Sequence, residues 1–160
     1  MVTVRQAIDS EVIMIVKLSD EIIEDLRKQG HDDYFGGVDA EEVSESMKGE
    51  SATFVAVDET GKIVGFILAL KKEKSYCLNG YGVNPKCQGK GIAKSLVESV
   101  AAYALKNNVE VLSGTIHPDN TASRKCIQCV AEDYAEGHDF VHHMKDGRIL
   151  RRTPFEVKLV

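Results

Sequence analysis

Hydrophobic residues recur along the chain with two different periods, and each period predicts a type of element. Apolar positions three or four residues apart indicate a helix over about Glu11–Arg27, and a longer helix that begins near Gly91 and ends near Asn107. Ala40–Lys48 is expected to be a short acidic helix. Runs rich in β-branched and aromatic residues predict five strands: Val2–Ala7, Thr53–Val57, Ile63–Leu70, Tyr76–Val83 and Val109–Ile116.

The C-terminal third of the chain has a weaker pattern. The elements expected there are a helix capped by Asp119 or Asn120 and reaching about Val130, a strand ending near Tyr134, and two strands, Val141–Met144 and Phe155–Leu159, flanking the turn at Asp146-Gly147. The order of the elements predicts a mixed α/β fold with helices on both faces of one sheet. No linker-like stretch divides the sequence, so a single domain is expected over residues 1–160.

Composition narrows the classes of function. A net charge of -5 and a pI near 5.5 argue against a general nucleic-acid binder, which needs clustered Lys and Arg. The longest apolar run, Ile63–Leu70, is far shorter than the roughly 20 residues that cross a bilayer, so no membrane contact is expected. The chain shows no secretory features, and its four cysteines are expected to stay reduced in a cytoplasmic protein.

The segment Gly80–Leu96 contains the candidate chemistry. An extended run ends there, and a helix begins close to Gly89 and Gly91. Glycines allow a ligand to approach the backbone, and the first amides of a helix form a natural site for a phosphate. Two common phosphate loops are excluded, because a Walker loop needs Gly before Lys-Ser, where this chain has Ala93, and a dinucleotide fingerprint needs a third Gly, where it has Lys94.

The remaining pattern is a Gln or Arg, two residues, Gly, one residue, and then Gly or Ala. Three residues match it: Gln88, Gly91 and Ala93. Val83-Asn84-Pro85 precedes them, and a strand and Asn120 at the head of a helix follow at a suitable distance. In these features the chain resembles the GCN5-related N-acetyltransferase (GNAT) family, and the likeness extends over about Val2–Ala131.

The resemblance implies a mostly antiparallel central sheet, the GNAT-like acyl-CoA N-acyltransferase fold, with acetyl-CoA as co-substrate. Backbone groups of Tyr81 and Val83 would bind the pantetheine arm, and the Val83 amide would donate to the thioester carbonyl. Asn120 would reach the cofactor from the neighbouring strand. Backbone amides would hold the pyrophosphate, and they belong to Gln88, Gly89, Lys90, Gly91, Ile92, Ala93 and Lys94.

Two positions depart from the family pattern. The tyrosine that protonates the departing thiolate in the family falls at Ile127, and the Gly-Phe pair after that helix falls at Ala131-Glu132. A thiol has a pKa of about 8.5, so its thiolate is a fairly good leaving group and water can replace the acid.

Candidate residues for the acceptor side lie outside this segment. His117 is the candidate general base for the amine, although a turn residue before Pro118 needs no such role. Asp32, Asp33 and Tyr34 are candidate contacts for a cationic acceptor, and a solvated loop explains them equally well.

No metal site is expected. Cys126 and Cys129 lack a second pair of ligands at zinc spacing, and His138, His142 and His143 lack the spacing to carboxylates that catalytic sites show. The basic run Arg148–Arg152 is expected to be a solvated strand or turn.

The sequence therefore predicts an acetyl-CoA-dependent N-acetyltransferase that acts on a primary amine of a small molecule, by direct attack in a ternary complex. An amine of a protein is the alternative acceptor. A different class, an acyl-CoA sensor or regulatory domain without turnover, is suggested by Ile127. The resemblance also allows a homodimer.

Overall fold

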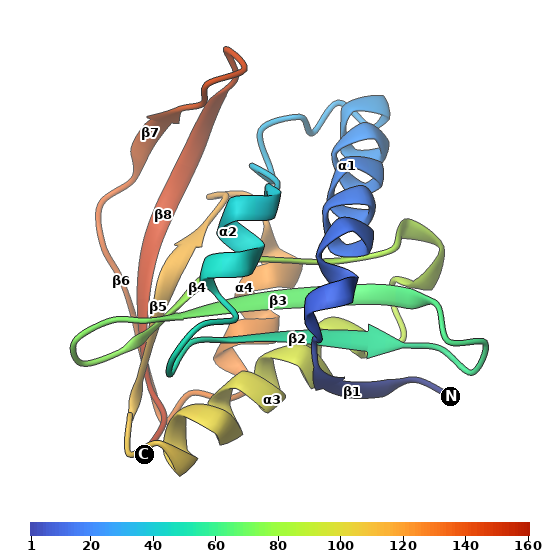
Figure 1. Cartoon of the computed structure of the whole chain (residues 1–160). Coiled ribbons are helices and arrows are strands. Elements are labelled where there is room, and N and C mark those ends of the chain that lie inside the picture. Colours follow the sequence, from blue (N-terminus) through green and yellow to red (C-terminus); the bar gives the residue numbers. More distant parts are fainter.

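The computed structural model describes residues 1–160 and contains one twisted sheet with helices packed against it (Figure 1). The helices are α1 (Val12–Lys28), α2 (Ala40–Glu45), α3 (Ile92–Lys106) and α4 (Thr121–Gln128). The strands are β1 (Thr3–Gln6), β2 (Ala52–Val57), β3 (Ile63–Lys71), β4 (Tyr76–Val83), β5 (Val111–Ile116), β6 (Asp133–Glu136), β7 (Phe140–His143) and β8 (Ile149–Lys158).

Seven strands follow the order β1-β2-β3-β4-β5-β8-β6, and β7 pairs with the first half of β8. All of these pairs are antiparallel except β4 with β5, which is parallel. The prediction of a mixed, mostly antiparallel α/β fold is confirmed.

The helices cover both faces of the sheet (Figure 1), as predicted. α3 and α4 pack on one face through a cluster that includes Leu96, Val100 and Ile127. α1 and α2 pack on the other face through a second cluster that includes Ile15 and Val43. β3 is buried along most of its length because its alternate side chains enter the two clusters.

The C-terminal hairpin differs from the prediction. The turn at Asp146-Gly147 is flanked by β7 and by a strand that begins at Ile149, not at Phe155. β8 is a single ten-residue strand. Its first part pairs with β7 and its last part with β6, and Pro154 lies between these two parts of the strand. Because proline has no N–H and usually interrupts a ladder, its position hid the continuity of β8 in the sequence.

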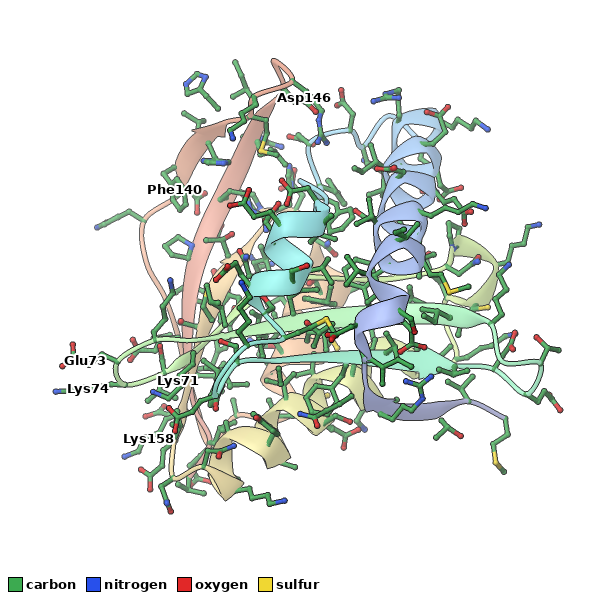
Figure 2. The ribbon with its side chains drawn as sticks, in the orientation of Figure 1. Lys71, Glu73, Lys74, Phe140, Asp146 and Lys158 are labelled. Atoms are coloured by element: carbon green, nitrogen blue, oxygen red, sulfur yellow. The ribbon has the colours of Figure 1, made fainter.

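The hairpin of β7 and β8 projects beyond the rest of the sheet, with Asp146 at its outer end and Phe140 at the start of β7, farther from the tip (Figure 2). The side chain of Arg148 fixes it to the loop between α1 and α2, donating to the carbonyls of Phe35 and Gly36 at 2.9 Å each. No helix in the structure combines the length and the apolar character that crossing a membrane requires.

Candidate functional site

β4 and β5 form a fork. Their parallel ladder has only three paired positions, from Tyr76 with Leu112 to Leu78 with Gly114. Beyond Leu78 both strands continue without pairing to each other, so backbone groups on their facing edges lack ladder partners. An extended ligand can satisfy such groups as an added strand does.

A β-bulge in β4 marks the point where the fork opens. Between the pairs Ala69–Leu78 and Ile67–Tyr81, β3 has one residue whereas β4 has two, Asn79 and Gly80. Gly80 has a φ of 128°, and a Cβ there would lie 2.9 Å from Val38 Cγ1. Only glycine therefore fits this bend.

The amide of Val83 points into the fork. The next amide, that of Asn84, donates to the carbonyl of Val64 at 2.7 Å, on the β3 side. Successive amides of a strand point to opposite edges, so the Val83 amide, and with it that of Tyr81, lies on the β5 side. This is the orientation that the sequence predicts for a donor to a thioester carbonyl.

The head of α3 presents a row of amides without partners in the chain. None of the amides from residue 88 to residue 94 donates to a backbone or side-chain acceptor, and the first amide of the helix that does so is Ser95, which donates to Gly91. Unpaired N–H groups at a helix start carry the positive end of its dipole. Such a row of donors is suited to bind an anion.

The two glycines of this turn have the conformation that such a site needs. Gly89 has a φ of 80° and Gly91 a φ of 78°, and a Cβ at either position would meet no atom within 4 Å. Both glycines line the cavity, so the backbone of this turn is accessible from it. A diphosphate, which needs several converging N–H donors and close approach, fits this turn.

α4 closes the far side of the fork. Asn120 caps the helix, accepting from the Ser123 amide at 3.1 Å through Oδ1, which leaves its Nδ2 free to donate. The Tyr81 hydroxyl, which comes from β4, hydrogen-bonds to the Ser123 hydroxyl. Burial raises the pKa of Tyr81 well above its usual value, so its phenol stays protonated at neutral pH. Ile127 is fully buried in the core below α4.

A cavity of about 1690 Å³ adjoins these elements. Its wall includes the fork, the head of α3, one face of α4, the loop between α1 and α2, and the hairpin of β7 and β8. Most of the predicted cofactor residues line it: Tyr81, Val83, Gln88, Gly89, Gly91, Ile92, Ala93, Lys94 and Asn120. Lys90 lines a smaller, separate pocket on the outer side of the same turn, together with Gly91 and Ile92.

His117 does not line this cavity, and its side chain is 0% exposed. Its Nδ1 accepts from the Asp119 amide at 3.0 Å, so Nε2 carries the proton and donates to Asp33 Oδ2 at 2.8 Å. Both nitrogens are engaged and neither offers a free lone pair. This geometry argues against the predicted role as general base and favours the turn-residue interpretation.

The candidate acceptor residues are separated by the fold. Asp33 faces His117 and Arg151, and Asp32 offers its carbonyl to Arg148, so neither carboxylate lines the cavity. Burial alone would raise the pKa of Asp33, but the hydrogen bonds from His117 and Arg151 and the positive charge of Arg151 outweigh it and lower that pKa. Tyr34 does line the cavity, with its ring 4.4 Å from that of His31 and 4.3 Å from that of His117.

Arg152 is a residue that the sequence interpretation missed. The sequence predicts it to lie in a solvated basic run, yet its side chain is half-buried and lines the cavity. Its guanidinium donates to Thr115 Oγ1 at 3.0 Å and to the carbonyls of Thr115 and Tyr34 at 2.6 and 3.0 Å. No motif marks it, because Tyr34 lies 118 residues away in the chain.

Comparisons with known proteins agree with this geometry. Residues 17–129 match the model of the acetyltransferase (GNAT) family. A curated relative from Chromohalobacter salexigens, an L-2,4-diaminobutyric acid acetyltransferase, is 42% identical over 72 residues. That match covers 43% of this chain and 38% of the relative, so the chain matches well under half of the relative's length.

Solved structures share the whole fold at low identity. A GNAT-family acetyltransferase from Streptococcus pneumoniae superposes with a TM-score of 0.78 at 12% identity, over 100% of both chains. A Salmonella typhimurium protein, solved with its cofactor acetyl-CoA, superposes with a TM-score of 0.73 at 18% identity, over 99% of this chain and 94% of that one.

Proposed function

We propose, since the chain belongs to the acetyltransferase (GNAT) family, that it transfers an acetyl group from acetyl-CoA to a primary amine of a small molecule. The observation that carries this proposal is the row of unpaired amides at the head of α3, which opens onto the cavity beside the β4–β5 fork. The name of the Chromohalobacter salexigens relative supports a small-molecule amine as acceptor.

The proposal names the residues that would hold the cofactor. The amides from residue 88 to residue 94 would bind its diphosphate, and the fork-facing backbone of Tyr81 and Val83 would bind its pantetheine arm. Asn120 would donate through its free Nδ2. When bound, acetyl-CoA supplies an acetyl group activated as a thioester, which the acceptor amine attacks directly in a ternary complex.

The chain's own groups set the conditions for that attack. The Val83 amide is placed to stabilise negative charge on a carbonyl oxygen in the fork. Because His117 has no free lone pair, we propose that the acceptor amine loses its proton to water in the cavity.

A second candidate function, a CoA-thioester sensor without turnover, is favoured by Ile127. This side chain is fully buried and can donate no proton, at the position where the family has a tyrosine acid. The sensor would use the same amides and the same fork.

One experiment separates the two. Acetyl-CoA is titrated into the protein by calorimetry, and CoA thiol release is then measured with a panel of diamines, amino acids and an N-terminal peptide. Binding together with turnover of a small amine is the expected result. Binding without turnover of any amine would favour the sensor, turnover of the peptide alone would identify a protein acceptor, and absence of binding would refute both functions.

A further inference from the structure

Three arginines lie close together at the start of β8, and they differ in whether a carboxylate pairs with them. Arg148 pairs with Asp146 at 2.8 Å. Arg151 pairs with Asp119 at 3.0 Å and with Asp33 at 3.5 Å. Arg152, whose side chain is half-buried in the cavity wall as that of Arg148 is, has no carboxylate within salt-bridge distance.

The hydrogen-bond partners of Arg152 fix its orientation but carry no negative charge, and Asp33 acts on its charge only from beyond salt-bridge distance. All three acceptors, two on Thr115 and one on Tyr34, are neutral oxygens. A guanidinium has five N–H donors, so two of them, one on each terminal nitrogen, remain unused. Burial lowers the pKa of Arg152, which shows that its charge is poorly solvated.

A partly desolvated, oriented guanidinium with two free donors is suited to a carboxylate, which accepts two parallel hydrogen bonds. We infer that Arg152 binds a carboxylate of the acceptor, and that the acceptor is therefore an amino acid rather than a simple amine. This inference rests on the proposed function and names the substrate class of the same cavity.

Charge elsewhere in the cavity agrees with an acceptor that also carries ammonium groups. Three acidic residues of α2 line the same cavity: Glu41, Glu42 and Glu45. A compound with a carboxylate and one or more amines would find both charges matched, whereas a diamine without the carboxylate would leave Arg152 uncompensated.

The test uses two compounds that differ by one carboxylate, L-2,4-diaminobutyrate and 1,3-diaminopropane. Calorimetry measures the binding of each to the protein saturated with CoA. The unaltered protein is expected to bind the diamino acid more tightly. In Arg152→Gln its dissociation constant should rise about 10- to 100-fold, as expected for lost hydrogen bonds to a charged group, whereas that of the diamine should change less than about 2-fold.

Two further variants guard against trivial explanations. Arg151→Gln removes the same charge one residue away, outside the cavity wall, and should keep the preference for the diamino acid. If Arg152→Gln does not fold, Arg152→Lys keeps the charge without the two-pronged geometry, and it should weaken diamino acid binding by about 3- to 10-fold.

A failure of this inference can be distinguished from a failure of the proposed function. Equal affinity of the unaltered protein for the two compounds, including no measurable binding of either, overturns the inference, and so does an unchanged preference in Arg152→Gln. A loss of CoA affinity in Arg152→Gln with an unchanged preference would assign the residue to the cofactor instead. Thiol release with the same compounds tests the proposed function, and a failure there leaves the binding result to decide on Arg152.

Discussion

Replacement of Gly91 by valine tests whether the head of α3 is the anion site. Gly91 has a φ of 78°, in the left-handed region, and no atom lies within 4 Å of the position that a Cβ would take. The cost to folding is therefore backbone strain alone, about 1–2 kcal/mol or somewhat more for a β-branched residue. Gly91 lines the cavity within the row of unpaired amides, so a bulky side chain there is expected to impair ligand binding far more than stability.

The magnitude follows from linkage. Acetyl-CoA at 100 times its dissociation constant should stabilise the unaltered protein by about 2.7 kcal/mol. For a chain of this size, each kcal/mol corresponds to about 2–4 °C, so the melting temperature should rise by about 5–11 °C. In Gly91→Val the melting temperature without ligand should fall by about 2–8 °C, and the rise on adding ligand should nearly vanish.

The assay is thermal unfolding with and without acetyl-CoA, and Gly49→Val is the matched control. Gly49 also has a positive φ, of 57°, with no atom within 4 Å of a Cβ, but it lies between α2 and β2 and does not line the cavity. The control should lose similar stability and keep its response to the ligand. A full response in Gly91→Val, or an equal loss of response in Gly49→Val, would refute the placement of the anion site.

Two other substitutions probe the surroundings of the site. In Gly114→Ala the new methyl would lie 2.8 Å from the Phe155 ring, so the variant should lose about 1–3 kcal/mol in denaturant unfolding. When Phe155→Leu is added to Gly114→Ala, part of the lost unfolding free energy should be recovered. If the losses of the two single variants simply added in the double variant, the Phe155 ring would not be what the new methyl meets. Asp33→Asn should lose about 1–2 kcal/mol at pH 7, because the carboxylate accepts from His117 and the side chain is 27% exposed. The folded-state pKa of Asp33 is lowered, so the stability that its carboxylate contributes is present above the unfolded pKa of about 4 and is lost as the pH falls through the folded pKa. If the difference in unfolding free energy between Asp33→Asn and the unaltered protein persisted undiminished at pH 2, this account would be contradicted.

The sequence predicted the elements best where one face of an element is buried along its whole length. β3 was predicted to within one residue and α3 to within a residue or two, because most of β3 and the apolar side of α3 are buried in the core. α2 is shorter than predicted, since the helix ends at Glu45 and the chain continues in turns to Lys48. In these segments local pattern and tertiary packing agree.

Only the second half of β8 was predicted as a strand, because the alternation of buried and exposed residues shifts by one position along it. Leu150 is buried and Arg151 exposed, but Thr153 is buried next, so the alternation shifts by one position before Phe155. A strict period of two cannot follow such a shift. The shift lies where the strand changes partner, which the local sequence does not encode.

The same contrast explains why the sequence offers a motif for the cofactor side and none for the acceptor side. Apart from Asn120, the groups that would bind acetyl-CoA lie within one short segment, residues 81–94, and backbone amides need only the right turn to be presented. The acceptor side is assembled from segments far apart: His117 meets Asp33 across 84 positions, and Arg152 meets Tyr34 across 118. Neither His117, beside a proline, nor Arg152, in a basic run, has a neighbour in the sequence that indicates its partners. Those partners engage both ring nitrogens of His117 but leave two N–H donors of Arg152 free for a ligand. If Arg152 binds the acceptor as we infer, acceptor choice depends on long-range contacts between the α1–α2 loop and β8, and substitutions in that loop should alter acceptor choice before they alter cofactor binding.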